Sequence, residues 1–164
     1  MAVTGLFLIL FLLMHMFGNL KVLASNEDFN RYAGFLRTIL NPILPGDSFL
    51  WIFRMFLLLA VVLHIWSAIR VNKQRNIGTG GAGRYSVKKN LSPENTYAAR
   101  TMFWGGWIIL AFLILHLLQF TISPGLLHNP PTDEAGRAGM VLTAFSHWWF
   151  VLIYLIAIIA VCMH

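Results

Sequence analysis

Charged residues are scarce in this chain. They make up 11% of its 164 residues, whereas a soluble domain usually carries about 25%. Hydrophobic residues make up 58%, more apolar surface than a soluble core of this size could bury. The composition therefore excludes an ordinary soluble domain. The net charge of +6 comes from residues that lie between apolar runs, so we attribute it to membrane topology and expect no nucleic-acid partner.

Cysteine is almost absent as well. A single residue, Cys162, excludes an internal disulfide framework and any CxxC metal or redox motif. Acidic residues number only six, and histidines are equally numerous. Any metal chemistry in this chain must therefore depend mainly on imidazole.

Long apolar runs, by contrast, are abundant. A membrane-spanning helix needs roughly 20 mostly apolar residues. Four runs meet this length, at about residues 2–20, 49–69, 102–122 and 146–164. Buried helices of a large soluble protein could look similar, but four such runs in 164 residues argue against that alternative. We expect an all-α integral membrane protein, a transmembrane four-helix bundle forming a single domain over residues 1–164.

Basic residues predict the orientation of these spans. The loop 70–101 holds seven of them: Arg70, Lys73, Arg75, Arg84, Lys88, Lys89 and Arg100. The first loop holds three and the loop after the third span holds one. Because cytoplasmic loops are enriched in Lys and Arg, we expect loop 70–101 to be cytoplasmic. The first and third spans then run from the inside to the outside.

Each predicted span contains one histidine. The four residues are His15, His64, His116 and His164. Ionisable side chains inside a membrane are costly and mark functional sites by default. A structural role in hydrogen bonds between helices is the alternative, and it is harder to maintain for four histidines than for one.

The depth of the histidines predicts how they pair. His15 and His116 lie towards the outer ends of their spans, and His64 and His164 lie towards the inner side. At 1.5 Å per residue, these two levels are about 10–15 Å apart. Two imidazoles facing each other across a bundle suit a bis-histidine haem, whereas structural zinc needs four ligands at one point. We therefore predict two haem b groups, an outer one and an inner one.

Small residues fit the same hypothesis. Gly5 and the Gly105–Gly106 pair lie at the inner level, on the two spans without an inner histidine, and Gly18 lies near the outer level. Glycine at these places would leave room for a macrocycle. Close packing of transmembrane helices is the alternative for each glycine.

Haem propionates need cations or hydrogen-bond donors. Arg54 is the candidate for the outer haem, and Arg70 and Arg100 are candidates for the inner haem. A side chain that snorkels to the interface is the alternative for Arg54. His128 and His147 flank the last loop, where we expect interfacial side chains rather than ligands, although one of them could give a proton to a quinone.

Four segments carry a resemblance to a known family. The first span, MAVTGLFLILFLLMHMFGNL, is similar to that of the cytochrome b subunit of succinate dehydrogenase and fumarate reductase, dihaem branch. FNRYAGFL, RMFLLLAVVLH and ARTMFWGGW resemble the same family, as do the nearly equal intervals between the four histidines. Family members usually have five spans. Because the chain begins and ends within apolar runs, we expect it to be part of a five-span subunit.

The resemblance implies a multi-pass anchor in a bacterial cytoplasmic membrane. It implies partners as well: a flavoprotein subunit with FAD, and an iron–sulfur subunit. Electrons from succinate, an intermediate of the tricarboxylic acid cycle, would pass through the haems to a quinone, typically menaquinone. The dicarboxylate site would lie on another subunit, so this chain would hold no catalytic residue.

By position, the family's haem ligands fall on His15 with His116 and on His64 with His164; the quinone site has no assigned residues. Two alternatives stay open. One is another quinone-linked dihaem transmembrane cytochrome b. The other is a proton-coupled transporter with a path lined by histidines.

Overall fold

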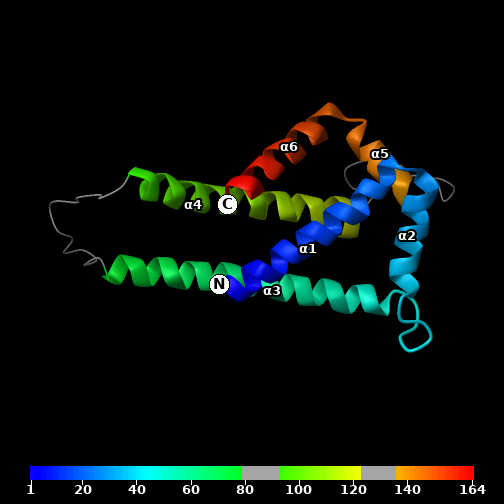
Figure 1. Cartoon of the computed structure of the whole chain (residues 1–164), viewed down its shortest axis with the longest axis horizontal. Helices are drawn as coiled ribbons and strands as arrows, with labels where there is room; N and C mark the ends of the chain where they lie inside the picture. The colour runs from blue at the N-terminus through cyan, green and yellow to red at the C-terminus, as the bar shows by residue number, and fades with distance from the viewer. Residues whose placement is uncertain (79–92, 123–135) are drawn as a thin grey trace. The chain divides into compact units, whose positions relative to one another are not determined.

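The computed structural model describes residues 1–78, 93–122 and 136–164, with side chains for 1–74, 101–122 and 136–164. These residues form helices and contain no strand (Figure 1). The all-helical prediction is therefore confirmed. The chain divides into two compact units, Met1–Val87 and Lys88–His164.

The first unit contains three α-helices. They are α1 (Ala2–Leu20), α2 (Asn26–Thr38) and α3 (Ser48–Gly78), with a short 3-10 turn, η1 (Lys21–Leu23), after α1. Helix α1 packs along α3, and α2 contacts both of them (Figure 1). Apolar residues surround α1 on all sides, so its sequence alone does not reveal which face meets α3.

The second unit repeats the pairing of two long helices. It contains α4 (Pro93–Leu117), a π-helical turn η3 (Leu118–Ile122), α5 (Gly136–Phe145) and α6 (Trp148–Met163). Helix α4 packs along α6, and α5 leads into α6 through a sharp bend (Figure 1). Each unit is thus built on one pair of packed apolar helices.

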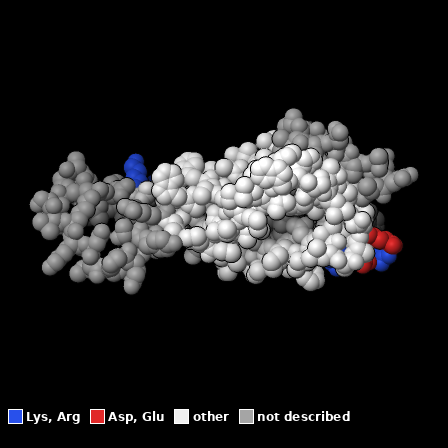
Figure 2. All heavy atoms as spheres, turned by 90° about the horizontal axis from the view of Figure 1, so that it is seen from above, with Lys and Arg blue, Asp and Glu red and all other residues white. Residues whose placement is uncertain are grey.

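Three helices are long and apolar enough to cross a membrane: Ala2–Leu23, Ser48–Gln74 and Thr101–Ile122. Only 6% of each span's apolar window is buried within the protein, so its surface must face lipid or other groups. On the face drawn in Figure 2, the described charged side chains gather in small groups, and a broad uncharged surface lies between them. These features indicate a membrane protein.

The fourth predicted span differs from the structure. Helix α6 has 16 residues, about 24 Å at 1.5 Å per residue, which is shorter than a hydrocarbon core of about 30 Å. It meets the criterion for a span only together with α5, from which it is bent by 92°. The predicted span over 146–164 thus corresponds to α6, the second helix of a pair that is broken at Ser146–His147.

The predicted basic loop is also shorter than expected. Helix α3 continues to Gly78 and α4 begins at Pro93, so much of 70–101 has a helical backbone. The helix continues because 70–78 contains no proline and places its glycine at the end. Arg84, Lys88 and Lys89 lie outside the described residues, and the cytoplasmic side of this segment stays a prediction.

Helix α2 was not expected from the sequence. Ser25 caps it: the Asp28 backbone N–H donates to Ser25 Oγ at 3.0 Å. Glu27 and Asp28 lie in the first turn, where acids favour the helix dipole, and Glu27 pairs with Arg31 at 2.9 Å. A serine followed three residues later by an acid is the signal that could have predicted this helix.

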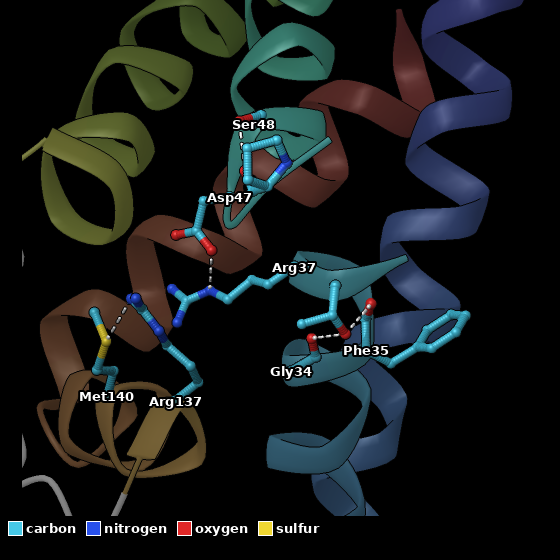
Figure 3. Close-up of polar contacts among 9 residues, drawn as sticks. Gly34, Phe35, Arg37, Asp47, Ser48, Arg137 and Met140 are labelled. Carbon is cyan, nitrogen blue, oxygen red and sulfur yellow. Dashed lines mark hydrogen bonds and ion pairs between the residues drawn. The ribbon is translucent and has the colours of Figure 1, made fainter. Parts of the chain in front are cut away.

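The connection from α2 to α3 is closed by polar contacts. Arg37 Nε in the last turn of α2 lies 3.6 Å from Asp47 Oδ1, just before α3 (Figure 3). Ser48 Oγ donates to the Pro45 carbonyl at 2.6 Å. A partly exposed ion pair contributes up to about 1 kcal/mol to folding stability. We therefore infer that these contacts mainly fix the path of the chain between α2 and α3.

Candidate functional site

In the first unit, the imidazole of His64 lies between two helices. His64 belongs to α3, and a Cβ atom on Gly5 of α1 would lie 3.4 Å from His64 Cε1. Thr4 Oγ1, on the neighbouring residue, is 3.2 Å from His64 Nδ1. The absence of a side chain on Gly5 thus lets α1 approach the ring closely.

The second unit contains the same arrangement. His164 follows α6, and a Cβ on Gly106 of α4 would lie 3.4 Å from His164 Cε1. A Cβ on Gly105 would lie 3.7 Å from His164 Nδ1 and 3.6 Å from the Ala160 carbonyl oxygen. The paired glycines therefore leave room on α4 for both the imidazole and the backbone of α6.

Each of the other two histidines stacks on a phenylalanine of its own helix. His15 on α1 stacks on Phe11, one turn earlier, with ring centroids 5.3 Å apart and an interplanar angle of 29°. His116 on α4 stacks on Phe112 at 5.8 Å and the same angle. Both histidines are half-buried. In each unit, a phenylalanine thus supports one face of the imidazole.

These contacts reveal an internal repeat. The segment GLFLILFLLMH ends at His15, and GWIILAFLILH ends at His116, so glycine, phenylalanine and histidine recur at the same intervals. Likewise AVVLH ends at His64 and AVCMH ends at His164, and both of their alanines are buried. The regular spacing of the histidines was noted from the sequence, but this repeat was missed. The two short patterns could have revealed it.

Within each unit, the two histidines lie at different levels. His64 lies beside Gly5, whereas His15 lies ten residues further along α1, about 15 Å away at 1.5 Å per residue. His164 lies beside Gly106, and His116 is again ten residues further along α4. In each unit, the two histidines are thus separated by about three helical turns.

His116 also begins a chain of polar side chains. Its Nδ1 is 3.1 Å from Tyr154 Oη of α6, and this hydroxyl donates to Gln119 Oε1 at 3.1 Å. Gln119 is fully buried in the π-helical turn η3, and its Nε2 has no hydrogen-bond partner among the described residues. Single π-helical turns occur frequently at functional sites. Neither Tyr154 nor Gln119 was predicted from the sequence.

The candidate propionate partners stack on tryptophans. The Arg54 guanidinium carbon lies 5.0 Å from the ring centroid of Trp51, and that of Arg70 lies 4.9 Å from Trp66. The contact of Arg54 is directed to the start of α3, as a snorkelling side chain requires. That of Arg70 is directed back along α3 to Trp66, which is two residues after His64 and therefore on the opposite face of the helix. Arg100 lies in α4, and its side chain is outside the described part.

Other candidates from the sequence have structural contacts. A Cβ on Gly18 would lie 2.7 Å from Tyr32 Cε1, so this glycine admits the tyrosine of α2 against α1. His147 Nδ1 is 3.0 Å from the Thr143 carbonyl oxygen, at the bend between α5 and α6. Because a carbonyl only accepts, His147 donates this bond and closes the end of α5. His128 lies outside the described residues.

The available donors suit a metal that needs few protein ligands. Among the residues described, no three His, Cys, Asp or Glu side chains gather where they could hold a metal ion. Structural zinc takes four such ligands, whereas a haem iron takes one or two and receives the others from the porphyrin. The repeated histidines, each close to a glycine or a flat aromatic ring, fit axial haem ligands in chemistry and in number.

Comparison of the chain with protein families, with curated proteins and with solved structures finds no match.

Proposed function

We propose that this chain is a dihaem cytochrome b that anchors a succinate:quinone oxidoreductase in the membrane. The observation that carries the proposal is the repeated unit, in which a helix bearing glycine, phenylalanine and histidine packs against a second helix bearing histidine. Each unit brings two imidazoles at two levels into apolar helices, where an ionisable side chain needs a functional partner. The resemblance of the first span to the succinate dehydrogenase and fumarate reductase family supplies the reaction class.

The repeat supports the proposed ligand pairs. His15 and His116 occupy equivalent positions in their units, and so do His64 and His164. Two ligands of one iron must reach it from opposite sides at the same level. A pair drawn from one unit would be about 15 Å apart along the helix axis, which disfavours pairing within a unit. We therefore assign one haem to His15 with His116 and the other to His64 with His164.

The residues of the chain hold and shape these sites. Two of these histidines would hold each haem, which would then supply electron transfer and not oxygen binding. Gly5, Gly105 and Gly106 keep side chains away from the inner-level imidazoles. Arg70, six residues after His64 on α3, is the candidate from the sequence for pairing with an inner propionate. When bound, haem supplies one-electron transfer between a partner subunit and a membrane quinone.

The proposed partners are an iron–sulfur subunit and a flavoprotein with FAD, and the proposed electron acceptor is menaquinone. The resemblance supports this assignment, and so does the excess of basic residues in 70–101, which favours a cytoplasmic location. The dicarboxylate site would then belong to the flavoprotein. Another quinone-linked dihaem cytochrome b would lack these partners, and a histidine-lined transporter would be colourless when purified.

Purification of the tagged chain from its native membrane tests the proposal. We expect a red complex that contains a flavoprotein and an iron–sulfur subunit and whose haem is reduced by succinate. Reversing two charges, in R84E/K88E, should lower recovery of the soluble subunits about tenfold, which corresponds to about 1.4 kcal/mol.

The same purification contains its control. Haem content should be unchanged in R84E/K88E, because the ligands lie on the apolar helices and not in the basic segment. A haem protein without soluble partners would leave only the alternative cytochrome b. Cross-links from the soluble subunits to residues 123–145, instead of 70–101, would invert the proposed topology.

A further inference from the structure

Two of the four histidines are held by a hydroxyl group from a neighbouring helix. Thr4 Oγ1 of α1 lies 3.2 Å from Nδ1 of His64 on α3. Tyr154 Oη of α6 lies 3.1 Å from Nδ1 of His116 on α4. In both contacts the nitrogen is Nδ1, and the two contacts occur in different units. The direction of each bond decides which ring nitrogen carries the proton.

The hydroxyl proton of Thr4 is used in a hydrogen bond to a backbone carbonyl. Thr4 Oγ1 donates to the Met1 carbonyl oxygen at 2.9 Å. If Thr4 donated to His64 instead, its Oγ1 and the Met1 carbonyl oxygen would lie 2.9 Å apart without a proton between them, and this contact would be repulsive. A hydroxyl has one proton, so Thr4 must accept the bond from His64. His64 is therefore protonated at Nδ1.

The hydroxyl proton of Tyr154 is likewise used in a hydrogen bond, here to a side-chain amide. Its hydroxyl donates to Oε1 of Gln119, an amide oxygen that can only accept. With the Gln119 amide oriented as in the structure, Tyr154 has no second proton to give. It must accept from Nδ1–H of His116. The two histidines thus share one tautomer, reached through different partners.

From these contacts we infer that Thr4 and Tyr154 are positioning residues that prepare His64 and His116 to ligate haem iron through Nε2. This inference rests on the proposed function. A neutral imidazole protonated at Nδ1 carries its lone pair at Nε2, and an acceptor on the N–H makes that lone pair more basic. The hydroxyl also fixes the rotation of the ring. Metal-ligating histidines generally have such a partner for the second nitrogen.

The Thr4–His64 and Tyr154–His116 contacts do not occupy equivalent positions in the internal repeat. In the internal repeat, the position equivalent to Thr4 is Gly105, and the position equivalent to Tyr154 is Arg54. Glycine has no side chain and arginine has no acceptor, so neither can take a proton from a histidine. Thr4 would therefore support a ligand of one proposed haem, His64, and Tyr154 a ligand of the other, His116. Removing one hydroxyl should affect one haem only.

Redox titration of the haems in the purified, full-length complex tests this inference. A more basic ligand stabilises oxidised iron, so loss of the hydroxyl should favour reduction. In Tyr154→Phe, the midpoint potential of the His15–His116 haem should rise by about 30–60 mV, a threefold to tenfold change at 59 mV per tenfold for one electron. In Thr4→Val, the His64–His164 haem should rise by a similar amount. The other haem should keep its potential in each variant.

Two matched variants separate this role from a general structural one. Thr4→Ser keeps the hydroxyl and should restore the wild-type potential. Tyr32→Phe removes a tyrosine hydroxyl next to Gly18 and should shift neither haem. If Tyr154→Phe does not retain its haem, Thr4→Val and Thr4→Ser decide the question through the other haem.

The possible failures are distinguishable. Wild-type protein without haem would overturn the proposed function itself. Two bound haems whose potentials stay unchanged in Tyr154→Phe and Thr4→Val would overturn this inference and leave the proposed function standing. Equal shifts in Thr4→Val and Thr4→Ser would also overturn it, because the serine hydroxyl should preserve the contact.

Discussion

Replacing His15 with alanine is expected to remove one of two haems, and replacing His64 with alanine is expected to remove the other. Each substitution would delete one of the two proposed protein ligands of one iron. The haem absorbance per purified chain should fall by about half in each variant. Redox difference spectra would show which component is lost.

The partner histidines complete this test. His116→Ala should lose the same component as His15→Ala, and His164→Ala the same component as His64→Ala. The repeat predicts this outcome, because the members of each pair occupy equivalent positions. If His15→Ala and His64→Ala removed one shared component while His116→Ala preserved it, the pairing would be wrong.

Leucine at Gly5 or at Gly106 is expected to remove the haem that His64 and His164 share. A Cβ atom at either glycine would already lie 3.4 Å from the Cε1 atom of the facing histidine, and three more carbons cannot fit in the remaining space. The imidazole would be displaced from its ligating position. The loss should match that of His64→Ala, and the His15–His116 haem should remain. Haem quantification and redox difference spectra check both parts.

Gly34 offers a matched control in α2. A Cβ at Gly34 would have no neighbour within 4 Å, so Gly34→Leu should retain both haems. Loss of both haems in Gly5→Leu would indicate general unfolding of the first unit instead of a local clash. Retention of both haems in Gly5→Leu and Gly106→Leu would show that these glycines do not border a haem site.

Much of the fold could be predicted because spanning helices have a strong length requirement. The first three spans were expected from their apolar runs alone and are confirmed as helices long enough to cross a membrane. The fourth was expected over 146–164, where α6 meets the criterion for a span only together with α5. Residues 138–163 are almost uniformly apolar, so the composition does not reveal the bend at Ser146–His147. Helix α2 is amphipathic and short, and only its Ser25 cap predicts it.

The candidate site was only partly accessible from the sequence. Histidine in an apolar run is conspicuous because its burial is costly, and this marked all four residues. Thr4, Gln119 and Tyr154 were not marked, since uncharged polar side chains are ordinary in transmembrane helices and often bond to their own backbone. Their importance depends on contacts between distant segments, such as Thr4 with His64. Such contacts become visible only when the helices are packed.

The most direct test of the account is the number of haems in the full-length protein. Purified from its native membrane, the chain should contain two protohaem groups per polypeptide when the pigment is quantified as its pyridine complex. Two haems are expected because the two proposed pairs of histidines would supply four iron ligands. A content of one haem per chain, or of none, would contradict the account.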